Sequence, residues 1–474
     1  MNKEEICFES ASSMREKLIA EELTSEELTE LFIERIQKLN PKINAYCTFT
    51  FDLAREAAKE ADNLIHEGNQ DLPLLCGIPI SIKDLMEIEG YRTTFGSKLY
   101  EDYVSNTDEI AVKRLKEAGA VILGKTNTPA FGHIAVSHNL VFETTKNPWN
   151  LEKTSGGSSG GAGASVAAGL GPLALGSDGG GSIRIPSSFC GIFGLKPTFG
   201  RVPRNLHGTI GWATLDHYGP LTRYVEDAAL MLEALWGPHP SDRFILPAPK
   251  TDLYHPLMEG ELPKLKIGLS SDLGFVKAID PEVEEGVSEA AKEFENMNWT
   301  VDPVKIKIRK PELAFNTIVT AGFAYDLQKE YKKQKEKIDD TLQKMIEAGL
   351  TYSALDVKRA EAKREEINAK IEQQFKKYDL LISPSTAVPA FDLGIMYPPK
   401  IAGKGVSPVA WMSYTYPLNM TGHPAASIPC GWTKGGLPIG MQIIGKRFDE
   451  LTVLQAAKAF QNLKPWQAKK PEWA

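Results

Sequence analysis

The sequence predicts an α/β fold in which helices cover a sheet. Short apolar runs typical of buried strands, such as Leu75–Ile82 and Ala120–Leu123, alternate with helical patterns such as Ile110–Ala118. Hydrophobic residues make up 42% of the 474 residues, which is enough for a sizeable core. This length is compatible with one large domain or with two.

The N-terminal region, about 10–68, is predicted to be helical. Leucines and other apolar residues recur there at near-helical spacing among charged residues. Thr24 followed by Glu27 has the pattern of a capping box, which predicts a helix start. A second amphipathic helix is expected to begin near Asp52 and to end near Gly68, a suitable C-terminal cap.

The segment 154–200 is dense in Gly, Ser and Ala but is not a typical flexible linker. Apolar residues such as Val166, Leu175 and Phe193 are interleaved throughout it. A flexible linker has no use for this much apolar surface, whereas a core in which backbones approach closely does. We therefore expect this segment to be tightly packed inside the fold.

The C-terminal half alternates in the same way and contains one charged insertion. Residues 310–377 are strongly helical and rich in Lys and Glu, and we expect a solvated helical insert there. Further strands and helices are predicted at Leu265–Gly274, Pro281–Asn296, Leu380–Ser383, Ala426–Pro429, Ile439–Ile444 and Glu450–Leu463.

Charge and cysteine usage exclude several classes of function. The net charge of -7 gives no reason to expect nucleic-acid binding. The five cysteines are widely spaced without a C-x-x-C pair, which favours reduced thiols in a cytoplasmic protein. We see neither a signal peptide nor a run long enough to cross a membrane.

Common catalytic motifs have little support. Gly156–Gly160 matches the G-x-S-x-G pattern of a nucleophile elbow, but the elbow requires a preceding strand, and Asn147–Thr154 is polar and contains Pro148. The same loop lacks the Gly-Lys-Ser/Thr ending of a phosphate-binding loop, and no dinucleotide fingerprint follows a strand. The scattered histidines form no H-E-x-x-H motif, so we predict no metal and no cofactor.

A lysine base is a better hypothesis. Lys83 comes directly after the apolar run that ends at Ile82. Burial at the end of a strand would lower the pKa of its amine, and a neutral amine is a competent general base. The alternative is an ordinary surface pair of Lys83 with Asp84, and the residues alone leave both interpretations open.

A serine nucleophile is predicted at Ser182, which follows Gly179, Gly180 and Gly181. Unhindered backbone amides beside a serine can point at one place and stabilise an oxyanion. The alternative is a simple turn, where Gly-rich stretches usually occur.

The segment from Gly156 to Thr198 resembles the signature segment of the amidase-signature family. Further blocks that resemble the family are Gly77–Asp84, Gly124–Pro129, Tyr218–Arg223, Asn419–Pro424 and Gly436–Gly440, so the resemblance covers about 10–465. It implies a single domain over 1–474 with a large mixed central sheet covered by helices on both faces.

The resemblance also implies a Ser–cis-Ser–Lys triad at Ser182, Ser158 and Lys83. Ser182 would be the nucleophile, and Ser158 would relay its proton to Lys83 through a cis peptide between Gly157 and Ser158. The amides of residues 179–182 would form the oxyanion hole. Gly132 would lie near the scissile amide, together with Ser158.

The activity implied is hydrolysis of a small-molecule amide through a serine acyl-enzyme. The chain looks more like free-standing amidases than like the A component of a tRNA-dependent amidotransferase at Ile185-Pro186, Gly200–Pro203 and Tyr416–Asn419. That A component is the first alternative function. An inactive binding protein is the second alternative. Similar proteins are often homodimers. Apolar residues in Phe131–His138, Trp212, about 314–326 and Trp411–Tyr416 favour apolar acyl or aryl substrates.

Overall fold

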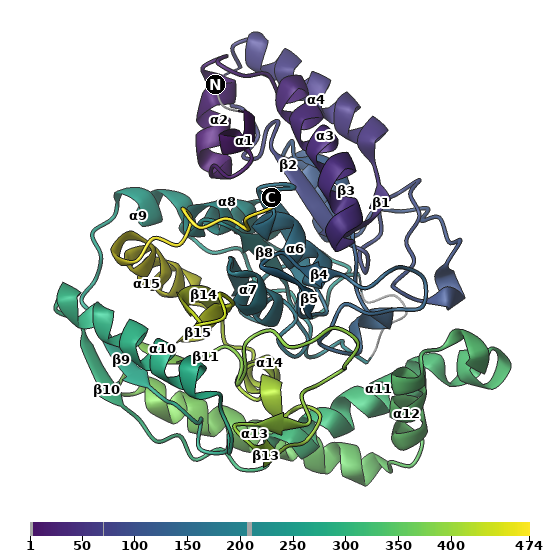
Figure 1. Ribbon diagram of the computed structural model, residues 1–474, viewed down its shortest axis with the longest axis vertical. Coiled ribbons are helices and arrows are strands. Elements are labelled where there is room, and N and C mark those ends of the chain that lie inside the picture. The colour runs from purple at the N-terminus through teal and green to yellow at the C-terminus, as the bar shows by residue number, and fades with distance from the viewer. Residues whose placement is uncertain (1–2, 70, 206–210) are drawn as a thin grey trace.

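The computed structural model describes residues 3–69, 71–205 and 211–474. Its centre is an 11-stranded mixed sheet, shown in Figure 1, with the strand order β1-β3-β2-β6-β8-β7-β14-β15-β11-β9-β10. The strands are β1 (Tyr46–Phe49), β2 (Pro79–Lys83), β3 (Val121–Thr126), β6 (Leu173–Ser177), β7 (Phe193–Lys196), β8 (Tyr218–Thr222), β9 (Lys266–Leu269), β10 (Thr300–Pro303), β11 (Leu380–Pro384), β14 (Ala425–Trp432) and β15 (Pro438–Gly445).

Both parallel and antiparallel pairs occur, which confirms the predicted mixed sheet. Strand β2 runs parallel to both β3 and β6, whereas β6 is antiparallel to β8. Two small hairpins lie outside this sheet. They pair β4 (Lys146–Asn147) with β5 (Asn150–Thr154) and β12 (Lys400–Ile401) with β13 (Lys404–Gly405).

Helices cover both faces of the sheet. On β15, the side chain of Ile439 faces Gly286 of helix α10, whereas a Cβ at the next residue, Gly440, would meet Ser188 of helix α7. Successive strand residues point to opposite faces, so α7 and α10 lie on opposite faces. Gly445 returns to the face of Ile439 and is covered by Val453 of helix α15.

The helices are α1 (Lys3–Ile6), α2 (Ala11–Ile19), α3 (Ser25–Ile43), α4 (Phe51–His66), α5 (Ile110–Glu117), α6 (Gly160–Ala167), α7 (Arg184–Cys190), α8 (Val225–Leu235), α9 (Tyr254–Glu259), α10 (Pro281–Lys292), α11 (Pro311–Lys333), α12 (Asp340–Gly349), α13 (Ala354–Phe375), α14 (Tyr416–Thr421) and α15 (Glu450–Leu463). Figure 1 shows α1 to α4 at one end of the molecule, beside β1 to β3, and α11 to α13 at the other end.

Several predicted helix boundaries are confirmed. Helix α3 begins with the capping box, in which Thr24 caps the amide of Glu27 and the Glu27 carboxylate returns to the Thr24 amide. Gly68, just after α4, has a φ of 68°, the left-handed conformation expected of a C-terminal cap. Helix α15 spans Glu450–Leu463, as predicted, with Asp449 capping its start.

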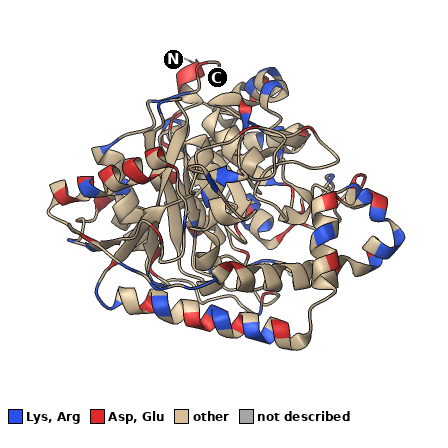
Figure 2. Cartoon of the chain, turned by 60° about the horizontal axis from the view of Figure 1, so that its bottom comes forward, with Lys and Arg blue, Asp and Glu red and all other residues tan. Residues whose placement is uncertain are grey.

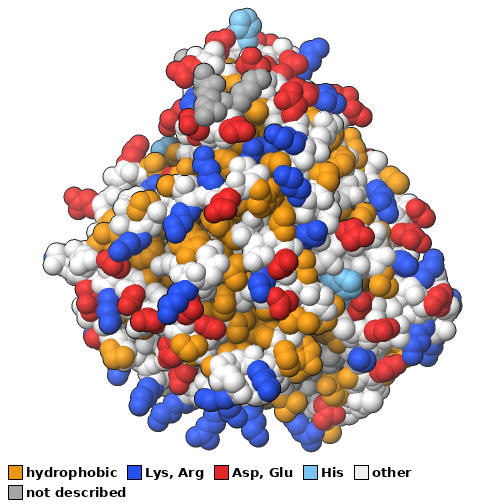
Figure 3. Space-filling model, in the orientation of Figure 1, with side chains coloured by type: hydrophobic (Ala, Val, Ile, Leu, Met, Phe, Trp, Pro, Cys, Tyr) orange, Lys and Arg blue, Asp and Glu red, His pale blue; other side chains and the backbone are white. Residues whose placement is uncertain are grey.

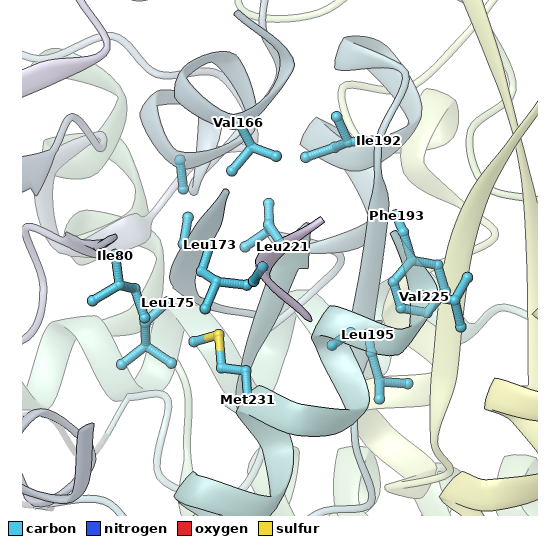
Figure 4. Close-up of a cluster of buried hydrophobic side chains, with 14 of the residues drawn as sticks. Ile80, Val166, Leu173, Leu175, Ile192, Phe193, Leu195, Leu221, Val225 and Met231 are labelled. Carbon is cyan, nitrogen blue, oxygen red and sulfur yellow. The ribbon is translucent and has the colours of Figure 1, made fainter. Parts of the chain in front are cut away.

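The Gly-rich segment is packed inside the protein, as predicted. Every residue from 154 to 198 is buried. Gly161 shows why a small residue is needed, since a Cβ there would lie 2.4 Å from the amide nitrogen of Asn127. Figure 4 shows the surrounding core, where Val166 of α6 and Leu173 and Leu175 of β6 gather with Leu221 of β8 and Met231 of α8.

The charged insert does not behave wholly as predicted. Figure 2 shows charged residues concentrated on the outer helices, and α13 has alternating charges along its exposed side. Helix α11, however, buries Phe315, Val319 and Phe323 in the second hydrophobic core of the protein. The expectation of a solvated insert is therefore wrong for α11, because part of this helix forms interior structure.

Candidate active site

Lys83 is the last residue of β2 and is completely buried. Its Nζ donates to Ser158 Oγ at 2.7 Å, to Ser177 Oγ at 2.9 Å and to the Ser177 carbonyl at 3.4 Å. A surface pair with Asp84 is excluded, because Asp84 is also buried and instead pairs with Lys125 at 2.7 Å. Lys83 therefore contacts one serine predicted for the site and one, Ser177, that was not predicted.

Burial decides the protonation of Lys83. It lowers the pKa of the amine from 10.5 to about 7, although Asp216 and Asp178 nearby favour the charged form. A substantial share of the lysine is then neutral near pH 7. A neutral amine within hydrogen-bonding distance of a hydroxyl can accept its proton.

Ser158 lies between β5 and α6, and the peptide bond between Gly157 and Ser158 is cis. A strand, β5, does precede this serine, contrary to the expectation from its polar sequence. That strand pairs only with β4, outside the central sheet, so the setting still differs from the strand end of a nucleophile elbow. Gly157 is tightly enclosed, since a Cβ there would lie 2.6 Å from the Val136 amide nitrogen.

Ser182 lies in the loop between β6 and α7, next to Ser158. The amide of Ser159 donates to the carbonyl of Ser182 at 3.2 Å, which ties the two serine segments together. A Cβ at Gly132 would lie 3.1 Å from Ser158 Oγ, so Gly132 adjoins the same place. The structure thus brings together all four residues assigned to catalysis and substrate binding.

A buried ion pair holds the loop that carries Ser182. The Asp178 carboxylate accepts from the amides of Gly181 at 2.7 Å and Ile183 at 3.1 Å. Arg184 binds both carboxylate oxygens, at 2.9 Å through Nε and 2.8 Å through Nη2. Burial alone would raise the pKa of Asp178, but the charge and hydrogen bonds of Arg184 hold it well below its usual range.

The Asp178 contact removes one of the predicted oxyanion donors. The Gly181 amide points at Asp178 and is therefore committed. Within the described part of the chain, the amides of Gly179, Gly180 and Ser182 donate to no other group. These three remain available to stabilise a negative oxygen.

Ser182, Gly180 and Gly132 open onto a cavity of about 420 Å³ with a mainly apolar wall. All four predicted pocket segments contribute side chains to this wall, and α12 adds residues that were not predicted. The wall includes Ile134, Trp212, Phe315, Val319, Lys344, Met345, Tyr397, Val409, Trp411 and Met412. Figure 3 shows hydrophobic side chains gathered in the middle of one face, with charged side chains around them.

Sequence reasoning missed the residues that support the site. Ser177, Asp178 and Arg184 all lie in the Gly-rich segment, and Asn419 joins them from α14 by donating to Asp178 at 2.7 Å. One signal could have found Arg184: it is the only charged residue between Gly179 and Leu195, in a segment predicted to be buried. A buried arginine requires a carboxylate partner, and Asp178 is the nearest in sequence.

The described residues offer neither a metal-binding cluster nor a membrane helix. Among them, no three His, Cys, Asp or Glu side chains gather where they could hold a metal ion. In that same part of the chain, each helix is too short or too polar to cross a membrane.

Comparison with known proteins places the chain in a family. The chain is 36% identical to an acylamidase from Rhodococcus erythropolis, over 99% of this chain and 98% of that protein. It is 37% identical to the A component of the glutamyl-tRNA(Gln) amidotransferase from Moorella thermoacetica, over 99% of each. These identities do not separate the two kinds of relative.

A solved structure and a family model agree with these relatives. The crystal structure of a bacterial aryl acylamidase of the amidase-signature enzymes has a TM-score of 0.90, with 30% identity over 97% of each chain. The family model for amidases matches residues 27–454. The chain therefore belongs to the amidase family, also known as the amidase-signature family.

Proposed function

We propose that this amidase-family enzyme hydrolyses a carboxylic amide through an acyl-enzyme on Ser182, with Ser158 and Lys83 as its proton relay. The observation that carries the proposal is the 2.7 Å hydrogen bond between Lys83 Nζ and Ser158 Oγ, buried beside the Ser182 loop. A histidine base is not needed, because burial already lowers the pKa of Lys83 to about 7.

In the first half of the reaction, neutral Lys83 accepts the Ser158 hydroxyl proton while Ser158 accepts the proton of Ser182. The Ser182 oxygen forms a bond to the amide carbon, and the carbonyl oxygen becomes an oxyanion held by the three available amides. The carbon–nitrogen bond then breaks. The leaving nitrogen takes a proton from Ser158, which is replenished from the Lys83 ammonium.

In the second half, water attacks the acyl ester. The relay takes the proton of the water to Lys83, the ester carbon–oxygen bond breaks, and the Ser182 oxygen recovers a proton from Ser158. The products are a carboxylic acid and an amine or ammonia, and the enzyme returns to its starting state. No cofactor is required by these steps.

The cavity wall supports an apolar acyl or aryl group in the substrate. Aromatic and aliphatic side chains such as Phe315, Trp411 and Met412 dominate it, and Lys344 is the one Lys or Arg among its lining residues in the described chain. A wall of this kind stabilises apolar groups by burying them, at about 25 cal/mol per Å². The similarity to acylamidases agrees with this substrate class.

A second candidate function is that of the A component of an amidotransferase. The 37% identity to this component of a glutamyl-tRNA(Gln) amidotransferase favours it. A shared fold does not fix function, and such a component would work only in complex with partner chains. We favour the free-standing hydrolase on the segments Ile185-Pro186, Gly200–Pro203 and Tyr416–Asn419. The intact lysine–serine contact argues against an inactive binding protein.

The test is turnover of a panel of aryl, alkyl and unsubstituted amides by purified chain, with rapid acid quenching and intact-mass measurement. We expect hydrolysis of at least one apolar amide and a transient mass increase equal to its acyl group. Ser182→Ala should lose both signals, whereas Ser165→Ala, at another buried serine, should keep them. Absence of turnover by folded wild type, regained only with a co-purified partner, would favour the amidotransferase function.

A further inference from the structure

A second cavity, of about 380 Å³, lies beside the active site and has a different character. Its wall contains five aromatic rings, from Phe95, Tyr100, Tyr103, Phe131 and Phe323. It also contains three carboxylates, from Glu87, Asp326 and Glu330, and no lysine or arginine among its described lining residues. We call it the aromatic–acidic cavity.

Four of these rings, all except that of Phe323, form one connected cluster. Phe95 is within 6.4 Å of each of the other three, measured between ring centroids, at 5.2 Å from Tyr100 and 6.2 Å from Tyr103. Tyr100 lies edge-on to Phe131 at 5.9 Å. Aromatic faces carry partial negative charge, so a cluster of rings around a cavity attracts a cation.

The carboxylates reach the cavity from two sides. Phe323, Asp326, Leu327 and Glu330 share one face of α11, because their spacing follows the helical repeat. Glu87 comes from the loop after β2 and accepts a hydrogen bond from the Tyr103 hydroxyl at 2.7 Å. Negative charge therefore faces the rings from both walls.

One carboxylate oxygen of Glu330 can still accept a hydrogen bond. Its Oε2 is buried and has no hydrogen-bond partner in the described structure. Glu330 and Tyr100 line the same cavity, and burial, with the added effect of the Glu330 charge, raises the pKa of Tyr100. A buried carboxylate oxygen without a partner is costly unless a donor occupies the space beside it.

We propose that the aromatic–acidic cavity binds an organic ammonium group. Such a group matches the wall: an N–H bond meets the Glu330 oxygen that has no partner, its positive charge meets the carboxylates and the ring faces, and its alkyl chain packs against the rings. A bare metal ion would leave the aromatic surface unused, and a neutral ligand would leave the negative charge of the carboxylates uncompensated.

The cavity adjoins the catalytic residues through two side chains. Phe131 belongs to its wall and immediately precedes Gly132. The Trp212 Nε1–H donates to the Phe131 carbonyl at 3.0 Å, and the Trp212 ring stands over Gly179 and lines the main cavity. If the proposed hydrolysis holds and the apolar main cavity takes the acyl group, the ammonium belongs to the amine half of the substrate, which then carries a second, protonated amino group.

Binding is tested without catalysis, by calorimetry with hexylammonium and its neutral isostere hexan-1-ol. We expect the wild type to bind hexylammonium at one site about tenfold more tightly than hexan-1-ol. Glu330→Gln and Tyr100→Leu should each weaken hexylammonium binding severalfold. Glu312→Gln, on the same helix but outside the cavity, and Lys344→Gln, in the main cavity, should leave it unchanged. Equal binding of the amine and the alcohol, or unchanged binding to folded Glu330→Gln, would overturn the proposal.

The assignment to the amine half is tested by a matched pair of amides that share one apolar acyl group, an N-(6-aminohexyl) amide and an N-hexyl amide. Glu330→Gln should raise KM about tenfold for the first and not for the second. An unchanged KM for both would overturn this assignment while the ammonium site stands. If neither amide nor any member of the wider panel is hydrolysed, yet hexylammonium binds, the proposed hydrolysis fails and the ammonium site remains.

Discussion

Lys83 Nζ and Ser158 Oγ lie 2.7 Å apart although 75 residues separate them in the sequence. Lys83 is the last residue of strand β2, Ser158 lies in the Gly-rich segment, and both side chains are buried. The contact joins an amine with a lowered pKa to a serine whose next residue, Ser159, donates a hydrogen bond to the Ser182 carbonyl. Proposed catalysis depends on this contact and on the loop beside it.

The activity should rise with pH through about 7. Lys83 must be neutral to accept a proton, and it is neutral above its pKa of about 7. We expect kcat/KM for an uncharged amide to increase about tenfold per pH unit below this value and to level off above it. The measurement is a pH–rate profile between pH 5 and 9. A profile that stays flat, or falls, through pH 7 contradicts a lysine base.

Ser177→Ala should weaken catalysis without weakening substrate binding. Ser177 Oγ accepts a hydrogen bond from Lys83 at 2.9 Å, so it positions the base and favours its charged form. We expect kcat to fall about tenfold, KM to stay within twofold, and the inflection of the pH–rate profile to move to lower pH. Ser165→Ala serves as the control. An unmoved inflection would show that Ser177 does not tune Lys83.

Asp178→Asn should destabilise the protein and disable the Ser182 loop. The substitution leaves Arg184 buried without a counter-charge, and loss of one partner of a buried pair costs about 3–5 kcal/mol. The measurement is the free energy of unfolding in urea, together with kcat. Asp392→Asn breaks an exposed pair with Lys153 and should change neither quantity appreciably. Equal, small effects of the two substitutions would refute the structural role of Asp178.

Gly132→Ala should reduce activity more than its effect on stability would suggest. Gly132 has a φ of 69°, and a Cβ there would crowd Ser158 Oγ at 3.1 Å. Gly68 has nearly the same φ, 68°, with nothing within 4 Å of its Cβ position. Both alanine variants should lose about 1 kcal/mol of stability from the left-handed backbone. We expect Gly132→Ala alone to lower kcat, by about a hundredfold. Equal kcat values for the two variants would argue against the claim that Gly132 lies beside the reacting amide.

The sequence predicted local elements well where one physical signal dominates. The capping box at Thr24 and Glu27 and the final helix Glu450–Leu463 were found because caps and helical periodicity are local. Helix α6 was missed because its glycines disfavour a helix in isolation, and tertiary packing overrides this propensity. Strand β5 was missed because its sequence is polar.

The site was predictable in part for the same reason. Lys83 follows an apolar run in the sequence and Ser182 follows three glycines, so local pattern suggested a role for each, and family resemblance joined them to Ser158. The partners Asn419 and Ser177, and the pocket wall from α12, depend on contacts between distant segments that no local pattern reveals. The cytoplasmic location, the single domain and the homodimer stay predictions of the sequence.

The most direct test of the account is intact-mass spectrometry after treatment with a fluorophosphonate, on wild type, Ser182→Ala and Lys83→Met. The account predicts one adduct on wild type, none on Ser182→Ala, and strongly slowed labelling of Lys83→Met, whose serine has no base. Labelling of folded Ser182→Ala at the wild-type rate, or a folded wild type that takes no adduct and hydrolyses no amide, would contradict it.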